Sequence, residues 1–241
     1  MPSPTGSGAL AVDETPAKPS DLGVRTLSAI AMLAVAGAAL WFGGIVWTVL
    51  VAAVGFGVIR EFGQLIQKAG TPTLPQAGWA LFAIIYAGLA AWTLIWLRQA
   101  DIRLALLVIG LVIFTDVGAY FSGRTIGGPK IFPQTSPSKT WAGLLGGVAL
   151  AALFTGLMLK LWLGDVPLVQ HLWWEIVALG GGLAIVAQLG DFFESWLKRR
   201  AGVKDSGNLI PGHGGIFDRV DGMLAVAFLL GLSQIYLMLR G

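Results

Sequence analysis

The stretch Trp141–Leu163, WAGLLGGVALAALFTGLMLKLWL, decides the fold, because its only charged side chain is Lys160. A helix needs about 20 consecutive apolar residues to cross a bilayer core of about 30 Å. No ten-residue alternation of polar and apolar residues, typical of barrel strands, occurs in such runs. The sequence therefore predicts an all-α fold, a polytopic transmembrane helical bundle of about seven spans, with six to nine allowed by the boundaries. The predicted spans are 25–42, 44–66, 78–97, 103–122, 141–163, 173–197 and 220–239.

The composition agrees with a membrane protein. Of 241 residues, 56% are hydrophobic and 12% charged, and ten are Trp. The mean hydropathy of +0.76 exceeds what a water-exposed surface tolerates, so most apolar side chains must face lipid. The absence of Cys excludes disulfides, thiolate catalysis and Cys-bound metal sites.

Residues 1–24 differ from the rest of the chain in being rich in Pro, Ser, Gly and Ala. We predict a disordered cytosolic tail there, followed by a transmembrane catalytic domain over residues 25–241. A cleaved signal peptide ending near residues 34–36, AlaValAla, is the weaker alternative, since the usual basic start is absent.

The basic residues indicate the orientation of the spans. With the N-terminus inside, twelve of the sixteen bases fall on cytoplasmic segments, which fits the positive-inside rule. These are Lys18, Arg25, Arg60, Lys68, Arg124, Lys130, Lys139, Lys198, Arg199, Arg200, Lys204 and Arg219. The same topology places three polar segments at one membrane face, and polar groups at membrane depth are costly enough to suggest a site.

The first polar segment follows the fourth predicted span. Asp116 and Tyr120 lie one helical turn apart, and the loop beyond them carries Arg124, Lys130 and Lys139 between Gly and Pro residues. Such a loop suits phosphate oxygens, although an ordinary basic inner loop is the alternative. Asp116 is a functional candidate because it is an acid inside a span.

The second polar segment ends the sixth span. Asp191, Glu194 and Lys198 recur at helical spacing, with Ser195 one turn beyond Asp191 and Gln188 one turn before it. The alternative is that these residues form only a local Glu194–Lys198 ion pair at the helix end. Asp191 has no base at i+4, so we expect a metal ion or a base from another span beside it.

The third polar segment is Lys204–Gly222, KDSGNLIPGHGGIFDRVDG. Asp218 and Asp221 are three residues apart at the start of the last span, so both carboxylates share one helix face. Opposite Asp191 they would form an oxygen cage for Mg²⁺, although Asp218 alone is also explained as a helix N-cap. His213 and the neighbouring glycines form a turn that suits a phosphate.

Acids for a divalent metal, several bases and glycine turns at one face are the groups used in phosphoryl or nucleotidyl transfer. The Walker sequence GxxxxGK[ST] is absent, which disfavours ordinary ATP hydrolysis.

The order of these residues resembles a known family. From Ser195 the chain reads SWLKRRAGVKDSGNLIPGHGGIFDRVD, which is similar to the signature of phosphatidate cytidylyltransferases, also called CDP-diacylglycerol synthases. DVGAYFSGR, SPSKTWAG and the QLGD that ends at Asp191 resemble the same family. The resemblance covers Phe114–Gly222, the signature region of residues 114–222.

The resemblance implies the reaction of CTP with phosphatidic acid to give CDP-diacylglycerol and pyrophosphate. It also implies a Mg²⁺ cofactor, with a second metal ion left open, and the membrane lipid as a partner. A homodimer is an open alternative, and no nucleic acid is expected. We expect an integral protein of a bacterial inner (cytoplasmic) membrane, with the N-terminus and the active site facing the cytoplasm.

The implied site residues fall into three groups. The catalytic and metal-holding group is Asp191, Asp218, Asp221 and Glu194, with Lys198 and Ser195. The group expected around the triphosphate and pyrophosphate is Lys198, Arg199, Lys204, Arg219, His213, Gly214 and Gly215. The group expected to hold the second phosphate, of lipid or nucleotide, is Arg124, Lys130, Lys139, Ser136 and Ser138. Asp116 and Tyr120 are further candidates without a defined role.

Three alternatives remain at this stage. A CTP transferase for ether lipids would share the motifs. A CDP-alcohol phosphotransferase would need an Arg shortly after Asp221 and Gly222 and two further Asp downstream, and neither is present. A proton-coupled or ion-coupled transporter would use the intramembrane acids, but it would also need polar groups through the midplane.

Overall fold

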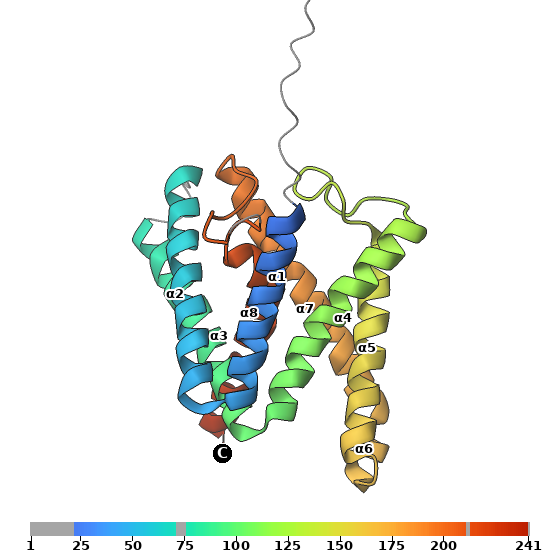
Figure 1. Ribbon diagram of the computed structural model, residues 1–241. Coiled ribbons are helices and arrows are strands. Elements are labelled where there is room, and N and C mark those ends of the chain that lie inside the picture. The colour runs from blue at the N-terminus through green and yellow to red at the C-terminus, as the bar shows by residue number, and fades with distance from the viewer. Residues whose placement is uncertain (1–21, 71–75, 211–212, 241) are drawn as a thin grey trace, which may run out of the picture.

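The computed structural model describes residues 22–70, 76–210 and 213–240, which form eight helices in the described part of the chain (Figure 1). They are α1 (Leu22–Phe42), α2 (Gly44–Ala69), α3 (Gln76–Ala100), α4 (Ile102–Thr125), α5 (Trp141–Leu163), α6 (Pro167–His171), α7 (Trp173–Arg200) and α8 (Phe217–Arg240). Seven of them are long and apolar enough to cross a membrane. This confirms the all-α bundle and the seven spans. The short helix α6 was not predicted, and most of the predicted tail lies outside the described residues.

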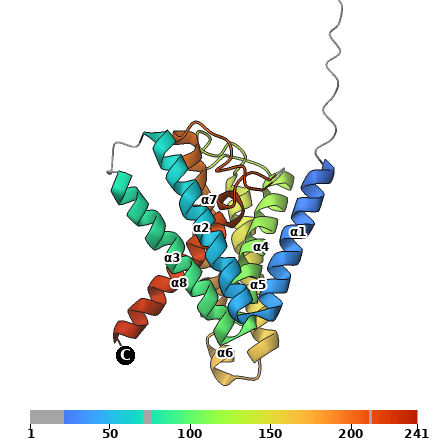
Figure 2. The same ribbon diagram turned by 60° about the vertical axis from the view of Figure 1, so that its left-hand side comes forward.

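The polar segments gather at one end of the bundle. Figures 1 and 2 show the start of α1, the loop between α4 and α5, and the loop between α7 and α8 at the top, with α6 and the end of α8 at the bottom. The three polar segments therefore lie at the same end of the bundle, as the distribution of basic residues predicts. Which membrane face this end occupies stays a prediction.

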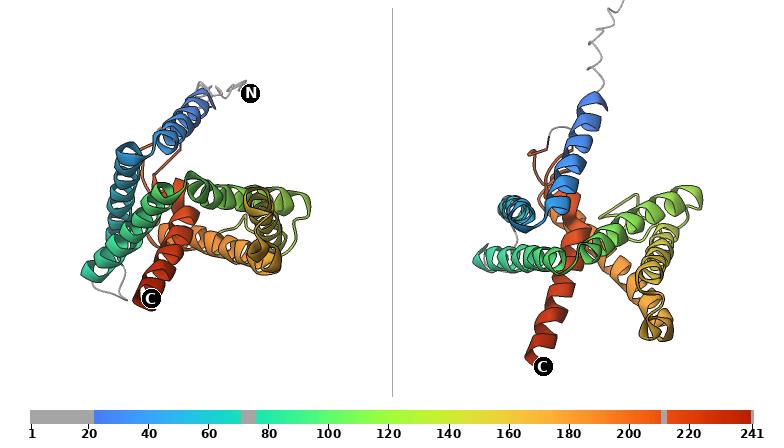
Figure 3. Two further views of the ribbon diagram at one scale, coloured as in Figure 1. Left: turned by 90° about the horizontal axis from the view of Figure 1, so that it is seen from below. Right: turned by 60° about the horizontal axis from the view of Figure 1, so that its bottom comes forward.

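Glycines let α4, α5 and α7 approach closely, as Figure 3 shows from below. A Cβ on Gly118 of α4 would lie 2.5 Å from the backbone oxygen of Gly146, and one on Gly147 of α5 would lie 2.8 Å from that of Thr115. Small residues at helix interfaces allow such backbone contact in membranes. The close packing fixes α4, which carries Asp116, against α5.

The C-terminal end of α1, which lies away from the polar segments, is held by a residue of α3. Arg98 donates from Nε to the carbonyl of Leu40 at 2.5 Å and from a terminal nitrogen to that of Trp41 at 2.9 Å. The last carbonyls of a helix lack intrahelical partners, so the guanidinium satisfies groups that would otherwise be unpaired. The indole of Trp47 on α2 also donates to the carbonyl of Leu94 on α3, at 3.0 Å.

The start of α4 shows how a local cap acts. Asp101 has an extended backbone, and its carboxylate accepts a hydrogen bond from the backbone N–H of Arg103 at 2.8 Å. The Arg103 side chain and this N–H hold the pKa of Asp101 below its usual value. The cap lies at the end of the bundle far from the polar loops.

An aromatic core lies below the polar loops. The fully buried rings of Phe62 on α2 and Phe217 on α8 have centroids 5.9 Å apart, and Phe193 of α7 lies 6.1 Å from Phe62. Aromatic pairs at this separation add attraction beyond the area they bury. The core therefore joins α2, α7 and α8 just where α7 ends and α8 begins.

Candidate functional site

Three carboxylates meet where α7 crosses α8. Ligand oxygens of Asp191 and Glu194 on α7 and of Asp221 on α8 all lie within 4.8 Å of one another. The crossing is close because Gly190 has no side chain: a Cβ there would lie 2.6 Å from the backbone oxygen of Asp221. The structure thus brings Asp221 to Asp191, as their predicted position at the same membrane face leads us to expect.

The acid cluster of Asp191, Glu194 and Asp221 fits a hard cation. Glu194 is 1% exposed, and its Oε1 has no hydrogen-bond partner among the described residues. Its Oε2 pairs with the Lys198 ammonium at 2.7 Å. Carboxylate oxygens are the ligands that Mg²⁺ and Ca²⁺ prefer, and a buried acceptor without a donor is costly. Both observations favour a divalent cation at this cluster.

Asp218 is placed differently from the other acids. Its Oδ1 accepts from Lys198 at 2.7 Å, and its Oδ2 accepts from the backbone N–H groups of Ser206 at 2.9 Å and Gly215 at 2.8 Å. The Ser206 hydroxyl donates to the same oxygen at 3.0 Å. A carboxylate has about four acceptor sites, so Asp218 is nearly saturated. The structure does not bring it into the acid cluster, and its role as a metal ligand stays a prediction.

Lys198 joins the two helices by salt bridges. Its ammonium pairs with Glu194 of its own helix and with Asp218 of α8, each at 2.7 Å. The local Glu194–Lys198 pair is therefore present, but it is part of a larger arrangement. Ser195 donates weakly to Asp191 Oδ1, at 3.4 Å.

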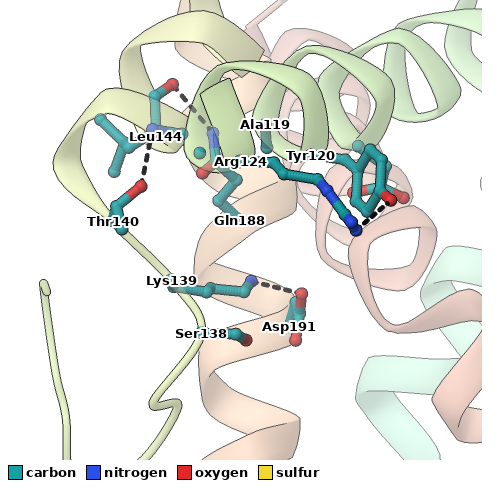
Figure 4. A pocket seen from close by; sticks show the side chains of 12 residues that line it. Ala119, Tyr120, Arg124, Ser138, Lys139, Thr140, Leu144, Gln188 and Asp191 are labelled. Carbon is teal, nitrogen blue, oxygen red and sulfur yellow. Dashed lines mark hydrogen bonds and ion pairs between the residues drawn. The ribbon is translucent and has the colours of Figure 1, made fainter. Parts of the chain in front are cut away.

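A cavity of about 420 Å³ opens beside the acid cluster, between α4, α5 and α7 (Figure 4). Lys139 forms a salt bridge with Asp191. The partner base predicted for Asp191 therefore comes from the loop before α5 and not from another span. Arg124 donates to the hydroxyl of Tyr120 at 3.0 Å. We call this space the α4–α5–α7 cavity; its polar lining is Asp116, Tyr120, Arg124, Ser138, Lys139, Thr140, Gln188 and Asp191.

Two side chains set the shape of this cavity. The Thr140 hydroxyl caps α5 by accepting from the N–H of Gly143 at 3.1 Å. Gln188 donates to the carbonyl of Leu144 at 3.3 Å and so ties α7 to α5. These two hydrogen bonds fix the start of α5 and therefore the end of the preceding loop, which carries Lys139.

A second cavity, of about 690 Å³, lies at the loop between α7 and α8. We call it the loop cavity; its lining is Arg25, Lys204, Asp205, Asn208, Ile210, His213, Gly214 and Arg219. Arg219 donates to the backbone oxygen of His213 at 3.2 and 2.8 Å, which holds the turn closed. Three cationic side chains against one acid make this cavity basic, and Arg25 was not predicted as part of a site.

Four of the residues that were expected only around the substrate phosphates line neither of these cavities. Lys130 is exposed and its backbone pairs with Thr140, whereas Ser136 is buried inside its loop. Arg199 donates to the carbonyl of Thr135 at 3.2 Å, and the N–H of Gly215 is engaged by Asp218. Their contacts with substrate stay predictions.

The sequence reasoning missed Glu61 of α2. This carboxylate is fully buried and accepts from the hydroxyl of Ser206 at 2.8 Å and from the N–H groups of Ile216 and Phe217 at 3.0 and 2.9 Å. A single acid within the second apolar run was a sufficient signal, because acids in spans are functional candidates by default.

Comparison with known proteins gives the same family as the motifs. Residues 68–236 match the model of the cytidylyltransferase family. Proteins named phosphatidate cytidylyltransferase are 41% identical over 183 residues in Brucella melitensis and 36% over 184 residues in Bacillus subtilis, in both cases over 73% of this chain and 66% of the relative. One from Rickettsia bellii is 32% identical over 225 residues, or 90% of this chain and 93% of the relative.

The matches to the Brucella and Bacillus proteins thus span slightly less than two thirds of those relatives' length. The matched region contains every residue of the acid cluster and both polar loops. The chain belongs to the cytidylyltransferase family.

Proposed function

We propose that the protein transfers the cytidylyl group of CTP to phosphatidic acid. A phosphate oxygen of the lipid attacks the α-phosphorus of CTP, a new P–O bond forms, and the bond from this phosphorus to the bridging oxygen breaks. CDP-diacylglycerol and pyrophosphate are the products. The lipid phosphate is already anionic at neutral pH, so charge neutralisation and positioning are the main requirements. The names of the relatives support this proposal.

The observation that carries the proposal is a continuous set of polar contacts between the two cavities. Lys139 pairs with Asp191, whose carboxylate adjoins those of Asp221 and Glu194. Glu194 and Asp218 share Lys198. Asp218 in turn lies against the loop cavity, since a Cβ on Gly214 would be 3.0 Å from its Oδ2. Two anionic substrates could therefore approach the acid cluster from two sides.

We assign the lipid phosphate to the α4–α5–α7 cavity. This cavity lies among membrane-spanning helices, and the rings of Tyr120 and Phe121 beside it are exposed. Acyl chains can remain in the bilayer while Lys139 and Arg124 face the phosphate. Ser138 would be a further donor.

We assign the triphosphate to the loop cavity. Lys204, Arg219 and Arg25 provide the positive charge there, and the left-handed backbone of Gly214, with φ of 82°, shapes the turn. His213 would be a donor to a phosphate oxygen. Lys198 retains one of its three N–H donors after pairing with two carboxylates, and this donor suits the pyrophosphate that leaves.

Asp191, Glu194 and Asp221 would hold Mg²⁺, which would neutralise charge on the triphosphate when bound. Asp218 is a further candidate ligand of this ion. The number of ions, one or two, stays open. We further propose that the polar end faces the cytoplasm of a bacterial cell, with residues 25–241 as the catalytic domain. A homodimer remains a prediction from the family resemblance.

The test is to incubate the purified protein with radiolabelled CTP, phosphatidic acid and Mg²⁺, and to look for labelled CDP-diacylglycerol. Product is expected from the native chain and about 100-fold or more less from Asp191→Asn, which keeps the shape but removes a charge. Parallel ester and ether substrates identify the lipid class. If folded native protein forms no product with either lipid, the proposal is wrong.

A further inference from the structure

Glu61 reaches the site region from α2, a helix that contributes nothing to the acid cluster. Its carboxylate accepts three hydrogen bonds, from the Ser206 hydroxyl and from the backbone N–H groups of Ile216 and Phe217. The first N–H groups of a helix lack intrahelical partners and favour a negative charge. Glu61 therefore caps the start of α8 from another helix.

The loop between α7 and α8 is shaped to this carboxylate. A Cβ on Gly207 would lie 2.8 Å from the Glu61 carboxyl carbon, and one on Gly215 would lie 2.7 Å from the backbone nitrogen of Gly207. Only glycine fits at two such crowded positions without a shift of backbone or carboxylate. The tilted contact between the rings of Phe62 and Phe217 holds the same two helices together one residue further on.

Glu61 is connected to the reacting region by a short series of hydrogen bonds. The Ser206 hydroxyl lies 2.8 Å from Glu61 Oε2 and 3.0 Å from Asp218 Oδ2. The other oxygen of Asp218 holds the Lys198 ammonium at 2.7 Å. A hydroxyl has one hydrogen, so it is shared between two carboxylates whose positions then depend on each other.

We infer that Glu61 is a positioning residue for the transfer reaction. It fixes the loop between α7 and α8 and the start of α8, and through Ser206 it sets the positions of Asp218 and the Lys198 ammonium. Glu61 itself touches neither substrate. The inference rests on the proposed function for its kinetic test, but the loop's order can be measured without any activity.

Glu61→Gln is the sharpest variant, because it keeps the size of the side chain. Gln offers one acceptor oxygen in place of two, so its NH₂ group must face either the N–H of Ile216 or the donors of Ser206 and Phe217. Ser206→Ala removes only the hydroxyl that joins the two carboxylates. Gly63→Ala is the matched control on α2, since a Cβ there meets nothing within 4 Å.

The experiment measures kcat, both KM values, the melting temperature in detergent, and the rate of tryptic cleavage after Lys204, all on purified full-length protein. We expect kcat of Ser206→Ala and of folded Glu61→Gln to fall by about 10- to 100-fold, the usual range for residues that orient a catalytic group. The double variant should lose less than the product of the two single losses, because both act on Asp218. Cleavage after Lys204 should be faster in Glu61→Gln and unchanged in Gly63→Ala.

Other outcomes are decisive as well. If native protein and Ser206→Ala turn over equally, the inference is wrong even if Glu61→Gln does not fold, since the contact to Asp218 then has no effect on the reaction. A melting temperature that falls while kcat of the folded variants stays native would reduce Glu61 to a structural role and overturn the inference. If the native protein has no activity, the proposed function fails, and unchanged tryptic cleavage in folded Glu61→Gln would independently overturn the inference.

Discussion

Gly190 of α7 lies against the backbone of Asp221 of α8, so that a Cβ on Gly190 would be only 2.6 Å from the Asp221 oxygen. The contact is with backbone, which cannot move aside as a flexible side chain does. It places Asp191, the next residue on α7, within reach of the Asp221 carboxylate. The missing side chain of Gly190 is thus a condition for the acid cluster.

Gly190→Ala should therefore separate the two helices and lower turnover by about 100-fold, because a misplacement near 1 Å has effects of that size. Gly182→Ala is the control on the same helix, where a Cβ meets nothing within 4 Å. It should keep native kcat and melting temperature. Equal activity of the two variants would show that the crossing at Gly190 does not set the distance between the acids.

The sequence predicted the spans well because the signal is local. The predicted span 141–163 coincides with α5, since Thr140 and Gly164 border a run whose only charged residue is Lys160. Helix spacing likewise placed Asp191 and Glu194 on one helix face. The distribution of basic residues between the two membrane faces placed Asp221 at the same end of the bundle. The spans and the shared helix face follow from residues that are near one another in the chain, whereas the common end follows from the distribution of bases along the whole sequence.

The parts that the sequence did not predict depend on contacts between distant segments. Glu61 lies more than 140 residues before Ser206, and no periodicity relates them. Asp218 and Asp221 share a helix face by spacing, yet Lys198 and Ser206 hold one while the other turns toward Asp191. Spacing predicts which face a side chain lies on, but the partner that it meets depends on how the helices cross.

Arg98 gives a prediction about stability alone. Its guanidinium satisfies the carbonyls of Leu40 and Trp41 at the end of α1 that lies far from the site. Arg98→Ala should destabilise the protein by roughly 1.5–3 kcal/mol, the range for hydrogen bonds to a charged group. The check is the melting temperature in detergent, and kcat at low temperature should stay native. Arg103→Ala, which removes an exposed pair with Asp101, is the control and should change the melting temperature less.

A divalent cation should stabilise the folded protein through the acid cluster. A ligand that binds only the native state raises stability by RT ln(1 + [L]/Kd), about 2.7 kcal/mol at 100 times Kd. Mg²⁺ added without substrate should therefore raise the melting temperature of the native protein. The shift should disappear in Asp221→Asn, which removes a charge from the cluster.

Asp218→Asn separates the two roles open to that residue. If Asp218 acts only by holding Lys198 and the loop, this variant should keep the Mg²⁺-dependent shift while losing turnover. Loss of the shift in both variants would instead make Asp218 a ligand. A native protein with no shift over the range of Mg²⁺ that supports turnover would contradict cation binding at the cluster in the absence of nucleotide.

The two cavities predict a division between the substrates. Arg219 lies in the loop cavity and Arg124 in the α4–α5–α7 cavity, and both side chains are exposed near their helix ends. If the triphosphate occupies the first and the lipid phosphate the second, each arginine should affect the KM of one substrate. An arginine contact with phosphate is a charge-assisted hydrogen bond, so we expect an increase in that KM of about tenfold or more.

The measurement is a pair of saturation curves for Arg219→Gln and Arg124→Gln, one with CTP varied and one with phosphatidic acid varied as a mole fraction in mixed micelles. Arg219→Gln should raise the KM for CTP and Arg124→Gln that for the lipid. Arg219 also donates to the backbone of His213, so tryptic cleavage after Lys204 is compared to exclude a general opening of the loop. A reversed pattern would exchange the two substrates between the cavities, whereas equal effects of both variants on both KM values would mean that the phosphates share one space beside Asp191.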